Sequence, residues 1–361
     1  MDTIIYKDID LDELDYVLRS IFKSSAHLDK ESIIYPSSSG NYAVKVSKKG
    51  EISLISGPAC NNKIIAKMKE KIISDIRNSK KQIGRSILFS DLPLYGYFRY
   101  KDLFQILHVP DHTPRPEFAG IGLHPILLEY VYDKSTNGFI NAYRQNKKSY
   151  EISWIMNMFL NSYIRRSESR IRHQWVRCGD DTSSKLCYTE YRFDNFSIES
   201  EEFSDTKELV TLKQVDPKEY YNYGQNISEG LKVPTIIQHL LDKVFSLDSK
   251  SLFKFLDICK LFALSNKLWE TSQTMAYLAA INTIEAIPKP KSKTEMCKCG
   301  RPLNGPTKEF REFLKKYAPS SKITDKIRKE LYNLRSDMTH KGKLFESDAY
   351  PYSHILFPKR I

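Results

Sequence analysis

Hydrophobic and polar residues follow two different periods along this chain, and the balance between them changes toward the C-terminal third. In residues 11–22 the apolar side chains recur at helical spacing, and residues 64–79 repeat that pattern. Residues 41–56 instead alternate apolar and polar side chains around a Lys-Lys-Gly turn, which predicts a β-hairpin. We therefore expect a mixed α+β region over residues 1–225.

The middle of that region contains short extended runs at residues 86–100, 104–109 and 123–132, and Pro and Gly interrupt any helical period there. They predict strands and loops. Residues 150–175 return to helical spacing, with an apolar first half and a basic second half, so we predict a helix. Residues 189–208 contain seven acidic and two basic residues, which indicates surface strands or a mobile acidic segment.

Amphipathic helical patterns dominate from Pro234 onward. Their predicted ranges are 234–247, 251–266, 268–287, 305–319 and 320–342. Pro288 and Pro290 end the third helix, because proline lacks an amide hydrogen and restricts the residue before it. Gly342 is the expected end of the last one. The pattern predicts an all-helical domain over residues 231–345, followed by a tail over residues 346–361.

Composition is that of a globular protein: the chain has 361 residues, of which 41% are hydrophobic. That length suggests two or three domains. No apolar run is long enough to cross a bilayer, and the N-terminal residues lack the order of a signal peptide. We expect a soluble, cytoplasmic protein without a membrane partner, whose six cysteines are reduced.

The net charge of +12 favours a polyanionic partner, and its distribution is uneven. Residues 289–343 hold 16 Lys and Arg against 6 Asp and Glu, and residues 144–177 hold 8 against 2. A basic stretch alone is often a solvated helix face. Two such stretches on an otherwise slightly acidic chain favour nucleic acid as the partner.

The last predicted helix carries an arginine and a histidine suited to phosphoryl chemistry. They are Arg335 and His340, within the run LRSDMTHKG. An imidazole titrates near neutral pH and can take up or release a proton, while a guanidinium stabilises a charged phosphoryl transition state. This chemistry requires no metal or other cofactor.

The order of elements in this part of the chain is a helix from Ala276 to Ile287, a Cys-containing loop, a basic helix and the run LYNLRSDMTHKG. This order resembles the HEPN superfamily, and within it the Apea-like branch with its R-x-x-x-x-H motif. The resemblance covers residues 231–345. It implies a helical bundle that acts as a metal-independent endoribonuclease of a bacterial anti-phage defence, abortive-infection or toxin system. It also implies cleavage of single-stranded or loop RNA, with transfer RNA as one candidate, and a phage-derived trigger or an antitoxin as candidate partners.

Carried over by position, Arg335 and His340 would be the catalytic pair. The resemblance gives supporting roles to Glu285, Ser336, Asp337 and Lys341. Many active members have Asn, Asp or His directly after the arginine, where this chain has Ser336, so Asp337 could supply the polar group instead. We expect the RNA backbone to lie on Lys315, Lys316, Arg328, Lys329 and Lys343.

On an ideal helix Arg335 and His340 lie about 140° apart around the axis, so they cannot face one narrow pocket. Either the helix loosens near Gly342, or two copies of the motif meet. HEPN nucleases are generally dimers, and a two-fold interface would bring two arginines and two histidines into one cleft. We therefore predict a homodimer through the C-terminal domain.

Other interpretations stay open. The domain could be a non-catalytic RNA-binding or dimerisation module in which Arg335 and His340 hold the interface together. A metal site is a weaker alternative at His108, His112 and His124 with Asp111 and Glu117, or a zinc site at Cys297 and Cys299, because neither set has usual ligand spacing. The predicted site therefore contains no metal.

Overall fold

The computed structural model describes most of the chain in segments. The described residues are 3–5, 10–22, 27–29, 32–36, 43–47, 51–55, 66–67, 70–77, 79–109, 124–160, 162–166, 175–178, 185–188, 197–223, 229–269, 271–287, 306–318 and 322–349.

The N-terminal residues form a small antiparallel sheet covered by one helix. In spatial order its strands are β1 (Thr3–Ile5), β5 (Glu51–Ile55), β4 (Ala43–Ser47), β3 (Ser32–Pro36) and β2 (His27–Asp29). Helix α1 (Leu11–Phe22) turns Leu14, Val17 and Leu18 toward the sheet, where they are fully buried. The predicted helix over residues 11–22 and the predicted hairpin over residues 41–56 are both confirmed.

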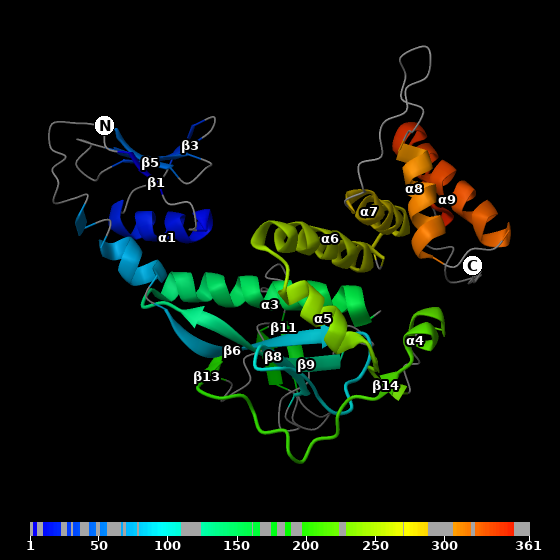
Figure 1. Ribbon diagram of the computed structural model, residues 1–361, viewed down its shortest axis with the longest axis horizontal. Helices are drawn as coiled ribbons and strands as arrows, with labels where there is room; N and C mark the ends of the chain where they lie inside the picture. The colour runs from blue at the N-terminus through cyan, green and yellow to red at the C-terminus, as the bar shows by residue number, and fades with distance from the viewer. Residues whose placement is uncertain are drawn as a thin grey trace, which may run out of the picture.

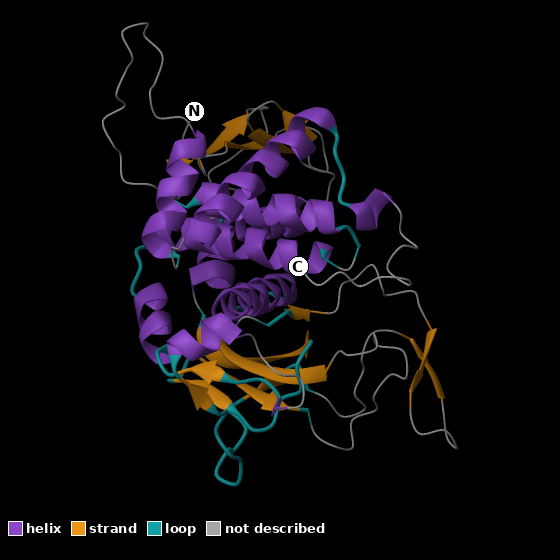
Figure 2. Cartoon of the chain, turned by 90° about the vertical axis from the view of Figure 1, so that its right-hand side faces the viewer, coloured by secondary structure: helices purple, strands orange, loops and turns teal. Residues whose placement is uncertain are grey.

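A larger sheet lies beneath the helices, in the lower half of both views (Figures 1 and 2). In spatial order it contains β10 (Ile164–Arg166), β6 (Lys80–Ser90), β9 (His124–Lys134), β8 (Phe104–His108) and β7 (Phe98–Tyr100), and β13 (Glu199–Ser200) also pairs with β6. Its pairs are antiparallel, and β6 and β9 align over their whole length. This confirms the strands predicted from the extended runs.

Two short strand pairs complete the described β-structure. β11 (Trp175–Cys178) pairs with β12 (Lys185–Tyr188) in an antiparallel ribbon. β14 (Gln214–Val215) and β15 (Val233–Pro234) pair in parallel. Helix α4 (Pro217–Tyr223) lies between the last two strands in the chain.

The helix predicted over residues 150–175 is wrong at both ends. Helix α3 runs from Gly138 to Leu160, and Ile164–Arg166 form strand β10 on the edge of β6. Asn157 closes the end of the helix, because its side chain donates to the carbonyl of Ile164 and its Oδ1 accepts from the amide of Ile164 at 3.2 Å. Edge pairing with β6 then satisfies backbone groups that the sequence pattern assigned to a helix.

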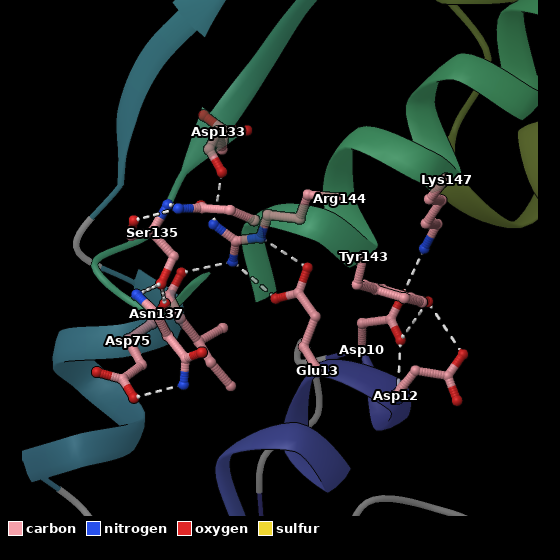
Figure 3. A network of polar contacts seen from close by, with 12 residues as sticks. Asp10, Asp12, Glu13, Asp75, Asp133, Ser135, Asn137, Tyr143, Arg144 and Lys147 are labelled. Atoms are coloured by element: carbon pink, nitrogen blue, oxygen red, sulfur yellow. Dashed lines mark hydrogen bonds and ion pairs between the residues drawn. The ribbon is translucent and has the colours of Figure 1, made fainter. Parts of the chain in front are cut away.

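A charged network joins α1, α3 and the π-helix η1 (Ile73–Arg77), which lies at the end of the helix predicted over residues 64–79 (Figure 3). Arg144 on α3 forms two hydrogen bonds to the Glu13 carboxylate, at 2.8 and 2.7 Å. The same guanidinium also donates to the backbone carbonyls of Asp133 and Ile76. This bidentate geometry fixes the N-terminal sheet and helix on one end of α3.

Helices from the C-terminal third pack on the larger sheet as well. The core around this sheet, hereafter the sheet core, includes Leu128, Ile152, Leu241 and Val244. α5 (Ile237–Phe245) supplies the last two, and α6 (Ser249–Leu268) adds partly buried side chains. Figure 1 shows α3 between the sheet and α6. The predicted division between residues 225 and 231 therefore lies within one continuous set of packed side chains.

The remaining described helices are α7 (Gln273–Ala286), α8 (Pro306–Tyr317), α9 (Lys322–Lys341) and α10 (Glu346–Ala349). Ile281, Phe310 and Tyr332 form a separate, smaller cluster, hereafter the helical core. The C-terminal part is thus helical, as predicted, and the chain combines an α+β N-terminal region with it. Within the described segments, every helix falls short of the length or apolar character that crossing a bilayer requires.

Candidate functional site

Arg335 lies on the inner side of α9, against the end of α7. α9 is held there by Tyr332, which packs on Phe310 with ring centroids 5.2 Å apart, and by buried Met338. Tyr332, Arg335 and Met338 recur at three-residue spacing along α9, so they share a helix face. The guanidinium also lies 5.9 Å from the centre of the Tyr332 ring.

The Arg335 guanidinium contacts Glu285, the acidic residue expected to support it. Nη2 of Arg335 donates to Oε2 of Glu285 at 3.1 Å, and both side chains are less than one quarter exposed. Two further atoms of the pair, Nε of Arg335 and Oε1 of Glu285, are buried and have no hydrogen-bond partner among the described residues. The contact is therefore a single hydrogen bond rather than the two-bond arrangement that a guanidinium and a carboxylate can form.

Tyr277 was not singled out from the sequence, yet it reinforces the contact between α7 and α9. Its hydroxyl donates to the backbone carbonyl of Leu331. Burial raises the pKa of Tyr277 to about 12, so the group remains a donor at neutral pH. Tyr277 stands two helical turns before Glu285, and this spacing on one helix face is the signal that could have identified it.

His340 occupies a different position from Arg335. It lies in the last turn of α9 and is exposed. The helix continues to Lys341 and ends at Gly342, whose φ of +64° is a left-handed conformation that glycine adopts without strain. The structure therefore does not bring Arg335 and His340 together within one chain.

The predicted supporting residues near Arg335 and His340 also differ from one another in exposure. Ser336 and Asp337 are half-buried, and Lys341 is exposed. Asp337 forms an ion pair with Lys341 at 2.8 Å, and the hydrogen bond from Lys341 lowers the pKa of Asp337 below its ordinary range. This ion pair follows the outer face of α9 and does not contact the Arg335 guanidinium through any described interaction.

Four of the five residues predicted to bind RNA are exposed: Lys315, Lys316, Lys329 and Lys343. Arg328 differs, because it is only 8% exposed. We therefore leave Arg328 out of the surface considered below.

Most of the alternative metal ligands lie outside the described residues. They are His112, Asp111, Glu117, Cys297 and Cys299. His108 is exposed at the end of β8, and His124 is half-buried at the start of β9. Across the described segments, no three His, Cys, Asp or Glu side chains are grouped so that they could hold a metal ion.

No protein-family model, curated protein or solved structure matches the chain.

Proposed function

We propose that this protein is a metal-independent endoribonuclease of the HEPN type, in which Arg335 and His340 act on RNA. The observation that carries the proposal is the single hydrogen bond between Arg335 and Glu285, which orients a partly exposed guanidinium and leaves its Nε without a partner among the described residues. An unsatisfied buried donor in a native protein calls for an explanation, and a site completed by a ligand or a second chain is one.

The regular geometry of α9 supports a site made by two copies. His340 follows Arg335 by five residues on an unbroken helix, so the two side chains differ by about 140° around the axis and about 7.5 Å along it. Of the two arrangements that could unite them, loosening of the helix near Gly342 would have to extend back past His340, and α9 is helical through Lys341. We therefore propose a two-fold dimer through the C-terminal helices, in which each Arg335 approaches the His340 of the other copy.

In the proposed reaction His340 of one copy takes the proton from a ribose 2′-hydroxyl. The 2′-oxygen attacks the adjacent phosphorus, and the bond from phosphorus to the 5′-oxygen breaks. The protonated His340 of the other copy returns a proton to that leaving oxygen. Arg335 stabilises the extra negative charge on the phosphate oxygens. The products are a 2′,3′-cyclic phosphate and a 5′-hydroxyl.

The electrostatic part of the proposal uses the exposed lysines. Lys315 and Lys316 lie in the last turn of α8, and Lys329 and Lys343 belong to α9 and the residues just after it. Each phosphate neutralised by such a side chain releases counterions, so RNA binding is expected to weaken steeply with salt.

The test is incubation of the full-length protein with total RNA in EDTA, beside His340→Ala, Arg335→Ala and the control Asn333→Ala, which alters an exposed neutral residue of α9. We expect cleavage by wild type and the control, and a loss of about 10³-fold in both site variants. Mapping the termini for cyclic phosphate checks the chemistry. Cleavage that requires added metal, or that survives in His340→Ala, would contradict the proposal.

A second candidate function is a non-catalytic RNA-binding or dimerisation module. It is favoured by the fact that the described polar contact of the Arg335 guanidinium is with Glu285 of its own chain, which also suits a purely structural role. In that case the protein binds RNA but the same incubation gives no cleavage. Arg335→Ala then lowers the free energy of unfolding and has no cleavage rate to reduce. Light scattering after size exclusion measures the predicted dimer, and a monomer that still cleaves RNA would exclude the two-copy site.

A further inference from the structure

A cavity of about 560 Å³ lies between α3, β10 and α6, away from Arg335 and His340. Its walls come from the second half of α3, from the short edge strand and from α6 between its middle and its C-terminal end. The volume is within the range of about 300 to 1,000 Å³ typical of small-molecule sites. The cavity is therefore large enough for a ligand of nucleotide size.

One wall of the cavity is aromatic. Tyr150 and Trp154 are one helical turn apart on α3 and stack with ring centroids 5.8 Å apart and an angle of 26° between the rings. Leu261 and Leu264 of α6 add apolar surface, and Tyr163 follows on the chain just before β10. Such a wall suits the face of a planar, aromatic group.

Cations surround this wall and outnumber the acids. Arg165, Arg166, Lys260 and Lys267 line the cavity, against Asp257 as the acidic lining residue. A lining with this excess of positive charge favours an anionic ligand.

The cations and rings are arranged in pairs. The Arg166 guanidinium lies 5.2 Å from the centre of the Tyr150 ring, and the Lys260 ammonium lies 5.7 Å from that of Trp154. Arg166 is oriented by a hydrogen bond from its Nη1 to Oδ1 of Asn146, at 2.5 Å. An aromatic base could take the place of a cation on a ring face, and the displaced cation could then bind the phosphate attached to that base.

We propose that this cavity binds a nucleoside phosphate, with the base on the Tyr150–Trp154 wall and the phosphate held by Arg165, Arg166 and Lys260. Neither a hydrophobic ligand nor a simple anion uses both halves of this lining. The ligand is either a free nucleotide or one nucleotide of an RNA chain, since both present the same chemistry. The proposal does not depend on RNA cleavage, because the residues proposed for catalysis are not part of the cavity.

The experiment is isothermal titration calorimetry of the full-length protein with ATP, AMP, adenosine, inorganic pyrophosphate and a short 2′-O-methyl oligoribonucleotide. The 2′-O-methyl groups prevent cleavage of the oligonucleotide through its 2′-oxygens. We expect saturable binding of a nucleotide, and weaker binding of adenosine or pyrophosphate alone. Trp154→Leu and Arg166→Gln should each weaken nucleotide binding about tenfold or more. Lys254→Gln is the matched control, since Lys254 is an exposed residue of α6 outside the cavity lining.

The two sources of the ligand give different results. Tighter binding of ATP or AMP than of the oligonucleotide indicates a free nucleotide, and the reverse order indicates an RNA chain. In either case both cavity variants must lose the binding. No saturable binding of any of these probes would overturn the proposal. So would pyrophosphate binding as tight as that of ATP, or unchanged nucleotide affinity in cavity variants whose circular dichroism and melting match wild type.

Discussion

At the scale of single residues, Glu129 is a buried charge with a full set of partners. It is completely inaccessible to solvent. Its carboxylate accepts hydrogen bonds from Arg85 Nε at 2.7 Å, Gln105 Nε2 at 2.6 Å, and both the amide and the hydroxyl of Ser204. It thereby fastens the acidic segment that follows β13 to the middle of the larger sheet.

We predict that Glu129→Ala lowers the free energy of unfolding by about 3 kcal/mol, because it leaves Arg85 and several hydrogen-bond donors without their acceptor. Urea denaturation followed by circular dichroism measures the change. Glu201→Ala is the control from the same acidic segment, since Glu201 is exposed, and it should change the value by less than about 0.5 kcal/mol. Equal effects of the two substitutions would show that the carboxylate is not held as described.

Asp75 makes the stability of the N-terminal region dependent on pH. Its carboxylate accepts a hydrogen bond from Asn137 (Figure 3). It also accepts one from Ser74 and forms an ion pair with Lys71 at 3.1 Å. Burial acts to raise the pKa of Asp75, but the hydrogen bonds from Lys71, Asn137 and Ser74 outweigh burial and lower the pKa below its ordinary 3.8. The ionised form is therefore favoured by folding.

A lowered pKa in the folded state gives stability that is present above the ordinary value of 3.8 and is lost as the pH falls through the folded value. We predict that Asp75→Asn is less stable than wild type at pH 7, and that the difference shrinks as the pH falls from about 5 to below 3.8. Urea titrations across this range measure it. Asp102→Asn is the control, because the Asp102 side chain is 93% exposed, and a similar pH-dependent difference for that variant would contradict the assignment.

At the scale of elements, the start of α7 is capped from an unexpected direction. Ser272 at the N-cap accepts from the amide of Met275, while Asp348 of α10 accepts from the amides of Gln273 and Thr274 at 3.0 and 2.7 Å. Burial acts to raise the pKa of Asp348, but the hydrogen bonds, first among them those from Thr274 and Ser272, lower it overall. Residues 346–349, from the predicted tail, thus stabilise the helix that carries Glu285.

We predict that Asp348→Ala lowers the local stability of the first turn of α7 by about 1 kcal/mol, which is the usual effect of losing a capping carboxylate. Hydrogen exchange of the amides at residues 273–275 measures it directly. Glu346→Ala, which removes an exposed carboxylate from the same short helix, should leave that exchange unchanged. Because the pKa of Asp348 is lowered, the effect should also fade as the pH drops below the ordinary 3.8.

The elements that were predicted best from the sequence are determined by residues close to them in the chain. The helix over residues 11–22 and the strands of the larger sheet follow from side-chain periodicity, and the end of α9 follows from Gly342. The third predicted C-terminal helix begins at Gln273 instead of residue 268, because Ser272 and Asp348 cap it there. A cap supplied from 75 residues away in the sequence is not visible in a local pattern.

The candidate site and the cavity also differ in how far a local sequence pattern could reveal them. The sequence motif identified Arg335 and Glu285, and the two residues do meet. It did not identify the aromatic and basic cavity, because its lining comes from α3, β10 and α6, and residues 164–166 were expected to continue a helix. Tyr150 and Trp154 at four-residue spacing gave a partial signal, but Lys260 joins them only through the tertiary fold.

At the scale of the whole molecule, the described hydrophobic side chains form clusters whose division does not fall near residue 230, although α6 and α7 also pack against each other. The sheet core extends from β6 through Leu241 and Val244 of α5 to partly buried residues of α6. The helical core of α7, α8 and α9 is a separate cluster. Since side chains within one cluster lose their contacts together, each cluster is expected to open as a unit.

This difference can be measured with two matched cavity-forming substitutions. Leu241 and Phe310 are both almost completely buried, at 0% and 1% exposure, and they belong to different clusters. We predict that Leu241→Ala lowers stability by about 2–5 kcal/mol and increases hydrogen exchange in β8 and β9, although Leu241 lies in the C-terminal third of the chain. Phe310→Ala, with a cost of similar size, should increase exchange in α8 and α9 and leave β8 and β9 protected. If Leu241→Ala instead loosened α8 and α9 while the sheet stayed protected, then α5 would belong with the helical core, and a domain boundary before residue 231 would describe the folding units better.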